Sequence, residues 1–193
     1  MQKEIVFITG NKGKIETAES YFSKVSNLKL SHIAMDLIEP QLDSVIDVAK
    51  YKAKQAFDIV KKPVFVCDAG FSIDELDGFP GAYAKYFNET IGNDGYLRLM
   101  NGKENRNCFF TTTIVYIDEF GKEHCFESHI KGRMTKEEAK FSNDEAWSNL
   151  WKIVILDGAD KTISELSSDE LTEIRDKNNS DICWIDFIKL LNE

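Results

Sequence analysis

The sequence predicts an α/β protein, and three observations lead to this class. Strands alternate with helices over roughly the first 70 residues, the pattern of sheets built from strand–helix units. VFVCD, residues 64–68, is a continuous apolar run typical of a strand buried on both faces. Residues 108–117 and 123–131 are two strand-like runs joined by Asp118-Glu119-Phe120-Gly121, the composition of an antiparallel hairpin. The 193 residues suffice for one ordinary core, so we expect residues 1–193 to form a single domain.

The first elements follow from local composition. Residues 4–9 are rich in β-branched and aromatic side chains and meet Gly10-Asn11, which predicts a buried strand and a tight turn. Apolar residues at helical spacing predict a helix over about 14–25. Residues 28–38 predict a second strand. A helix capped by Asp43 or Ser44 then runs to about Val60, before Pro63.

Glycine and proline divide the second half of the chain. LDGFPGAYAKYF, residues 76–87, predicts a constrained loop that enters a helix near Tyr83, and the glycines of 92–95 are expected to break that helix. The last third carries a short apolar run at 153–156 and predicts a closing helix at about 182–191. Between them, residues 164–180 are acidic and polar, which favours a solvated face over a metal site.

Charge and cysteine usage exclude several classes of function. The chain has 24 Lys+Arg against 33 Asp+Glu, a net charge of −9, which argues against stable nucleic-acid binding. No apolar stretch approaches the roughly 18 residues that span a bilayer. The four cysteines include no CxxC pair, so we expect buried free thiols in a reducing compartment. Together these features predict a cytoplasmic protein without membrane partners.

The segment TGNKGK, residues 9–14, is the first candidate for chemistry. It lies between a predicted strand and a predicted helix, where backbone N–H groups and the helix dipole can receive an anion. It lacks the spacing of a P-loop but supplies Thr9, Asn11, Lys12 and Lys14. An ordinary strand–helix turn with solvated lysines is the alternative at this point.

Two carboxylates are further candidates. Asp68 is predicted at the end of a buried strand, where open α/β sheets place their ligand crevice. A carboxylate there can bind a metal or orient a water, although an Asx turn explains the same spacing. Glu39 precedes Pro40 on a loop, and nothing local distinguishes it from a surface acid.

Several separated segments resemble the inosine triphosphate pyrophosphatase family, hydrolases of non-canonical purine nucleoside triphosphates. The matching segments are FITGNKGKIE, DLIEPQ, VFVCDAGFSI, LDGFPGAYAKYF and the pair Gly132-Arg133, in the family's order and at its separations. The resemblance covers about residues 3–135 and implies a long twisted mixed sheet with flanking helices and two lobes around a central nucleotide cleft. It also implies a homodimer and hydrolysis of a nucleoside triphosphate to the monophosphate and pyrophosphate.

The resemblance also implies roles for individual residues. Glu39 and Asp68 would bind Mg²⁺, and Asp68, Lys14 and Glu39 would be the catalytic residues. The family's PG-x-Y-x-K element falls on Pro80, Gly81, Tyr83 and Lys85. The substrate-binding residues implied in this way are Thr9, Gly10, Asn11, Lys12, Lys14, Lys52, Ala69, Gly70, Phe71 and Lys85.

The sequence departs from the family pattern at three places. Cys67 replaces an acid before the central aspartate, and Ala69 replaces a serine or threonine after it. In residues 146–162, Trp151-Lys152 stands roughly where the family has Asp-Pro. The Ser-His-Arg element that reads the purine edge is absent, and its region holds Ile174-Arg175-Asp176-Lys177 or, alternatively, Ser180-Asp181-Ile182. The triphosphate half of the site therefore matches the family, whereas the base half is rebuilt.

Two hypotheses stay open at this point. The first is a pyrophosphatase with altered or relaxed base selection, and the second is a degenerate homologue that binds a nucleotide and acts as a binding or interaction module. Trp147 and Trp151 are spaced either to stack on a base or, as is more typical, to fill a core.

Overall fold

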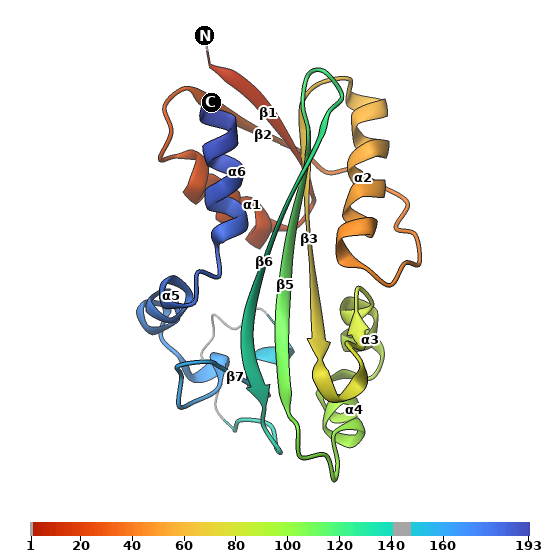
Figure 1. Cartoon of the computed structure of the whole chain (residues 1–193), viewed down its shortest axis with the longest axis vertical. Helices are drawn as coiled ribbons and strands as arrows, with labels where there is room; N and C mark the ends of the chain where they lie inside the picture. Colours follow the sequence, from red (N-terminus) through yellow and green to blue (C-terminus); the bar gives the residue numbers. More distant parts are fainter. Residues whose placement is uncertain (1, 141–147) are drawn as a thin grey trace. The chain divides into compact units, whose positions relative to one another are not determined.

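The computed structural model describes residues 2–140 and 148–193, which form strands and helices in alternation (Figure 1). The strands are β1 (Lys3–Ile8), β2 (Leu28–Ile33), β3 (Val64–Ile73), β4 (Pro80–Gly81), β5 (Asn107–Ile117), β6 (Glu123–Met134) and β7 (Val154–Leu156). The helices are α1 (Lys12–Phe22), α2 (Val45–Val60), α3 (Ala84–Thr90), α4 (Gly92–Leu99), α5 (Ser168–Lys177) and α6 (Ile182–Asn192). Short 3₁₀ helices occupy Asp74–Leu76, Asn149–Lys152 and Ile163–Glu165.

The strands form one 7-stranded mixed sheet, so the predicted α/β class is confirmed. The strand order is β2-β1-β3-β5-β6-β7, with β4 paired to β3. β1 pairs in parallel with β2 and with β3, in the register Val6 to Val64, whereas β3–β4 and β6–β7 are antiparallel. The parallel part follows from the strand–helix alternation at the start of the chain.

The chain divides into two compact units. Unit 1 comprises residues 1–69, 112–128 and 182–193, and unit 2 comprises 70–111 and 129–181. The long strands β3, β5 and β6 contribute residues to both units.

Unit 1 buries apolar side chains on both faces of its strands. Along β1, Ile5 and Phe7 belong to one buried cluster, and Val6 and Ile8 belong to another, because successive side chains of a strand point to opposite faces. Helices α1 and α6 cover the first cluster, and α2 covers the second (Figure 1). Residues buried on both faces explain why β1 and the start of β3 are continuous apolar runs.

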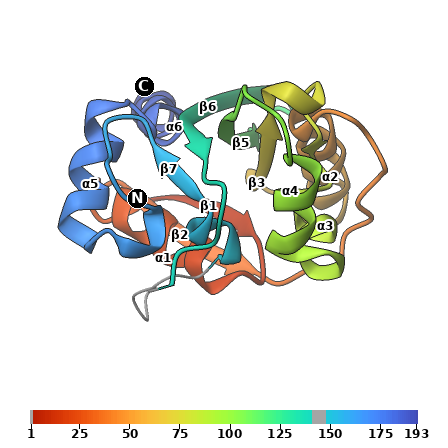
Figure 2. The same cartoon turned by 90° about the horizontal axis from the view of Figure 1, so that it is seen from below.

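Unit 2 has its own core, built on β3, β5–β7 and the helices that follow β4. Phe71 and Tyr96 pack edge to face with ring centroids 5.6 Å apart. Helices α3 and α4 lie side by side (Figures 1 and 2). The cluster also includes Met100, Leu150 and Ile153, each nearly or fully buried.

Three sequence-based expectations differ from the structure, and one further helix was not expected. The second strand ends at Ile33 rather than at residue 38. The strand that begins at Val64 continues to Ile73, so Asp68 lies inside β3 and not at a strand end. Gly92 interrupts the helix as expected, with φ of +68°, but a new helix, α4, begins there. The acidic stretch 164–180 contains helix α5.

The cysteines are free thiols, and three of them are buried as expected: Cys67, Cys108 and Cys183. Cys125 is exposed on β6, which corrects the expectation for that residue, because its side chain falls on the polar face of the strand. None of the helices in the described ranges is long and apolar enough to span a bilayer.

Candidate active site

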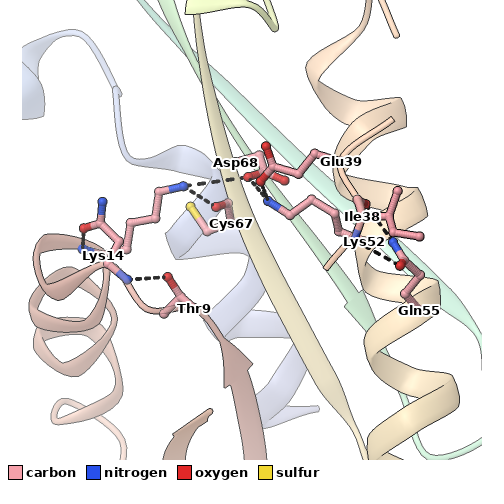
Figure 3. A network of polar contacts seen from close by, with 9 residues as sticks. Thr9, Lys14, Ile38, Glu39, Lys52, Gln55, Cys67 and Asp68 are labelled. Atoms are coloured by element: carbon pink, nitrogen blue, oxygen red, sulfur yellow. Dashed lines mark hydrogen bonds and ion pairs between the residues drawn. The ribbon is translucent and has the colours of Figure 1, made fainter. Parts of the chain in front are cut away.

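Asp68 is the centre of a polar network in unit 1 (Figure 3). It has the same strand parity as Val64 and Val66, whose side chains pack in the cluster covered by α2, so its carboxylate also faces α2. Its Oδ1 accepts a hydrogen bond of 2.7 Å from Lys52 Nζ. Its Oδ2 is buried and has no hydrogen-bond partner among the described residues. A buried carboxylate oxygen without a donor is a free ligand position, since such atoms are normally satisfied.

Lys52 joins the two candidate carboxylates. Its ammonium lies 2.7 Å from Asp68 Oδ1 and 2.8 Å from Glu39 Oε1. The side chains of Lys52 and Asp68 are each only 13% exposed, whereas that of Glu39 is 61% exposed. Burial acts to lower the pKa of Lys52, but Asp68 and then Glu39 outweigh it and the pKa lies above its usual 10.5. Lys52 is therefore cationic at neutral pH.

Lys14 reaches Asp68 from the predicted anion-binding loop. Its Nζ donates to the backbone carbonyl of Cys67 at 2.6 Å and lies 3.8 Å from Asp68 Oδ1. Asn11 places it there, because the Asn11 Oδ1 accepts from the Lys14 backbone N–H at 3.1 Å and caps α1. Thr9 Oγ1 accepts from the Asn11 backbone N–H at 3.1 Å. The side chains of Thr9 and Asn11 thus build the turn.

Glu39 lies on irregular chain between β2 and α2, and α2 holds that chain in place. Gln55 Nε2 donates to the Ile38 carbonyl at 2.8 Å, and Gln55 Oε1 accepts from the Ile38 N–H at 3.2 Å (Figure 3). Sequence reasoning did not single out Gln55. The available signal was its position one helical turn after Lys52, which places both side chains on one face of α2.

Cys67 contributes to this network through its backbone. Its side chain has the opposite strand parity to Asp68 and packs in the cluster with Phe7, Phe65 and Trp184. Burial raises the pKa of its thiol to about 11, so the thiol is neutral at pH 7. An acid at this position would be directed into an apolar core in this chain, which explains why cysteine fits here.

The other predicted substrate-binding residues divide between the units. Gly10, Lys12 and Ala69 belong to unit 1, where all three are exposed. Gly70, Phe71 and Lys85 belong to unit 2. The Phe71 side chain is only 1% exposed and is part of the core of that unit, so a binding role for it through the backbone stays a prediction.

The segment expected to hold a rebuilt base pocket is partly described. Trp151 is partly buried against the core of unit 2, as expected for a core tryptophan, and Lys152 Nζ lies 3.5 Å from Glu138 Oε1. Trp147 lies outside the described residues. In the region where Ser-His-Arg is absent, Arg175 forms an ion pair with Asp181.

The donor set of this network fits a hard divalent cation. Asp68 Oδ2 offers a buried oxygen, and the Glu39 carboxylate is adjacent across Lys52. Among the described residues no group of three or more His, Cys, Asp or Glu side chains converges. Two carboxylates are nevertheless the usual protein contribution to a Mg²⁺ site, where phosphate oxygens and waters complete the coordination.

The fold and the network define a mixed-sheet α/β protein with a site suited to a phosphate-bearing ligand, because ammonium groups and carboxylates meet there and Lys14 extends to them from the first turn of α1. The chain belongs to the Ham1 family, whose sequence profile matches residues 5–180.

Curated relatives are similar over most of the chain. A dITP/XTP pyrophosphatase of Methanopyrus kandleri is 34% identical over 174 residues, which cover 89% of this chain and 88% of that protein. The dITP/XTP pyrophosphatase of Methanothermobacter marburgensis is 36% identical, with 86% of each chain covered. The inosine triphosphate pyrophosphatase of Saccharomyces cerevisiae is 32% identical, again with 86% of each covered.

Solved structures share the fold. A HAM1 protein from Coxiella burnetii superimposes with a TM-score of 0.80 at 16% identity, covering 99% of both chains. The Ham1 protein of Staphylococcus aureus gives a TM-score of 0.78 at 19% identity, covering 98% of this chain and 97% of that one. These similarities confirm the predicted fold class.

Proposed function

We propose that this protein is a nucleoside triphosphate pyrophosphatase that acts on non-canonical purine nucleoside triphosphates, such as those of inosine and xanthosine. The observation that carries this proposal is the network in which Lys14 and Lys52 approach one carboxylate, Asp68, whose second oxygen is buried and has no hydrogen-bond partner in the described part of the chain. Membership of the Ham1 family and relatives that are named dITP/XTP pyrophosphatases support the same activity.

In this proposal the cationic side chains bind the triphosphate. Lys14 and Lys52 donate charge-assisted hydrogen bonds to phosphate oxygens, in exchange for the contacts that they make with Cys67 and Asp68. Exposed backbone N–H groups at the start of α1 add donors, and the helix dipole favours the anion there. Gly10 just before α1, Lys12 at its start and Ala69 on β3 are exposed and would contact the substrate.

Asp68 would orient the water that attacks the α-phosphorus. The Asp68 carboxylate accepts a proton from that water as the new O–P bond forms. The bond between the α-phosphorus and the bridging oxygen to the β-phosphorus breaks, and pyrophosphate leaves with that oxygen. The products are a nucleoside monophosphate and pyrophosphate.

Asp68 and Glu39 would hold Mg²⁺, which the two carboxylates and the phosphate oxygens together can coordinate. When bound, the ion neutralises phosphate charge and polarises the P–O bonds. Removal of divalent cations with a chelator is accordingly expected to abolish turnover.

We propose relaxed discrimination among bases. The Ser-His-Arg element is absent, and Arg175 of that region is paired with Asp181. A pocket that lacks the donors for a 6-oxo group loses the selectivity that such hydrogen bonds provide. A strong preference for inosine triphosphate over every canonical triphosphate would contradict this part of the proposal.

Pyrophosphate release, measured with inosine, xanthosine and canonical triphosphates in Mg²⁺, tests the activity. Asp68→Asn removes the charge with little change in shape and is expected to lower kcat by about 100- to 10,000-fold while substrate still binds. Asp58→Asn, on the exposed part of α2, is the matched control. Binding without turnover of any triphosphate by the natural protein would favour the binding-module hypothesis, and full activity in Asp68→Asn would contradict the role of Asp68.

In this proposal the protein is also a cytoplasmic homodimer that acts on a small molecule. The family resemblance supports a homodimer, which sedimentation analysis tests directly. The free cysteines support a reducing cytoplasmic location. The net charge of −9 supports a small-molecule substrate over nucleic acid as the partner.

A further inference from the structure

Gln55 binds the backbone of the loop that carries Glu39. A single side-chain amide satisfies both backbone polar groups of Ile38: Gln55 Nε2 donates to the Ile38 carbonyl at 2.8 Å, and the Ile38 N–H donates to Gln55 Oε1 at 3.2 Å. This arrangement imitates the pairing of a neighbouring β-strand, although residue 38 belongs to no strand. Gln55 is therefore used as a backbone anchor.

The anchor acts on the residue directly before Glu39. The Ile38 side chain is 66% exposed, so its packing contributes little to fixing the loop. On the other side of Glu39 stands Pro40, whose ring restricts the preceding residue to extended conformations. Glu39 is thus constrained from both neighbours, by two hydrogen bonds on one side and by a ring on the other.

The same helix face also receives the Glu39 carboxylate. Lys52, one turn before Gln55 on α2, has its Nζ 2.8 Å from Glu39 Oε1 and 2.7 Å from Asp68 Oδ1. Helix α2 therefore fixes the Glu39 backbone through Gln55 and the carboxylate through Lys52. The Glu39 side chain is 61% exposed, so without the anchor its carboxylate has many accessible positions.

We propose that Gln55 is a positioning residue that holds the Glu39 carboxylate beside Asp68 for binding of a divalent cation. The proposal rests on the proposed function for its catalytic consequence, but cation affinity is a property of the free protein. Removal of a residue that hydrogen-bonds to a metal-binding residue, and so orients it, typically lowers metal affinity by about 10- to 100-fold.

The test uses the full-length protein with Gln55→Met. Methionine has a similar length and a similar helix propensity but forms no strong hydrogen bonds. Gln2→Met is the matched control, because it removes a glutamine-to-backbone hydrogen bond, Nε2 to the Ser26 carbonyl at 2.9 Å, elsewhere in unit 1. The measurements are Mn²⁺ binding by calorimetry without nucleotide, and hydrogen exchange at the Ile38 amide.

The expected result is a rise of about tenfold in the Kd for Mn²⁺ and faster exchange at Ile38, both only in Gln55→Met. Higher metal concentration is expected to restore the rate of pyrophosphate release, since Gln55 itself does not contact substrate in this proposal. If Gln55→Met does not fold, Gln55→Ala removes the same amide with the best helix former and is expected to give the same shift.

An Mn²⁺ affinity within twofold of the natural protein, with faster Ile38 exchange, would overturn the proposal and leave Gln55 with a structural role only. The two proposals fail separately. A natural protein that hydrolyses inosine triphosphate while Gln55→Met keeps full Mn²⁺ affinity contradicts the positioning role alone. A tenfold loss of Mn²⁺ affinity in a protein that hydrolyses no triphosphate contradicts the proposed function alone.

Discussion

The proposed role of Lys14 depends on the length of its side chain. Its backbone belongs to the first turn of α1, yet its Nζ contacts the carbonyl of Cys67 and approaches Asp68. A long cationic side chain at a helix N-terminus is well placed for the distal phosphates of a nucleotide. We expect binding of the nucleoside part of the ligand to depend less on Lys14.

Lys14→Ala is therefore expected to weaken triphosphate binding by about 10- to 100-fold, which corresponds to the loss of a charge-assisted hydrogen bond. Binding of the monophosphate is expected to change by less than about threefold. Calorimetry with a non-hydrolysable inosine triphosphate analogue and with inosine monophosphate measures both. Lys54→Ala, on the exposed part of α2, serves as the control, and equal losses for the two ligands would contradict the proposed contact.

At the scale of single residues, the sequence predicted which side chains meet but not all of what they do. Lys14, Glu39, Lys52 and Asp68 form one network, as the resemblance implied. The side-chain oxygens of Thr9 and Asn11 accept backbone hydrogen bonds within the turn, and contact of these side chains with a ligand stays a prediction. The role of Gln55 depends on the path of an irregular loop, which no periodic pattern encodes.

A single acidic residue, Asp118, stabilises the turn of the β5–β6 hairpin. Asp118 Oδ1 accepts from the backbone N–H groups of Phe120 and Lys122, each at 2.9 Å, and Oδ2 lies 3.0 Å from His124 Nε2. Burial acts to raise the pKa of Asp118, but the hydrogen bonds from His124 and the two amides outweigh it, and the pKa lies below the usual 3.8. The folded state therefore favours the ionised form.

The stabilisation by ionised Asp118 is present above the unfolded pKa of 3.8 and is lost as the pH falls through the lower folded value. Asp118→Asn keeps an acceptor for the turn but removes the charge. We expect it to lower the free energy of unfolding by about 1 kcal/mol at pH 6, with the difference shrinking as the pH falls below 3.8. Urea unfolding at several pH values measures this, with Asp58→Asn as the exposed control; a pH-independent difference would contradict the assignment.

Helix α5 shows why one element escaped prediction. None of its residues is fully buried, and only Leu171 and Ile174 pack partly against the core of unit 2, so the apolar stripe that identifies a helix is very short. Its start is nevertheless specified by a capping box, in which Ser167 and Glu170 satisfy each other's backbone N–H groups. The pKa of Glu170 is lowered to about 2, mainly by a hydrogen bond from Lys161 and to a smaller extent by the hydrogen bonds from Ser167.

The position of Gly132 in the sheet explains why a glycine is needed there. Where β6 pairs with β7, a Cβ at position 132 would lie 2.4 Å from the backbone oxygen of Ile155. Backbone atoms cannot retreat as a flexible side chain can, so this pairing excludes any side chain at that position. The glycine of the Gly132-Arg133 pair is thus explained by close packing of strands.

At the scale of the whole molecule, apolar burial is organised as separate cores. Unit 1 has clusters on two strand faces, and unit 2 has its own cluster around Phe71 and Tyr96. The sequence predicted the apolar strands and the closing helix, because their patterns are local. The family resemblance implied two lobes, but local patterns did not predict which segments form each unit, since segments far apart in the chain, such as 1–69 and 182–193, share unit 1.

Phe187 tests the importance of the closing helix α6. It is fully buried, and its ring centroid lies 4.9 Å from that of Phe65 and 5.5 Å from that of Tyr116. Phe187→Ala is expected to lower the free energy of unfolding by about 3–5 kcal/mol. Urea unfolding measures this against Ile185→Ala, whose side chain is 52% exposed on the same helix. Similar losses in both variants would contradict this account of the core.

The place of α6 in unit 1 also sets an order for folding during synthesis. The cluster that contains Phe7 and Phe65 includes Cys183, Trp184, Phe187 and Leu191, and the ribosome adds these residues after all the others in that cluster. Both segments of unit 2, residues 70–111 and 129–181, have by then been translated. The apolar strands β1 and β3 therefore lack their covering helix α6 until the last residues have been translated. The nascent protein is most prone to aggregation during that interval.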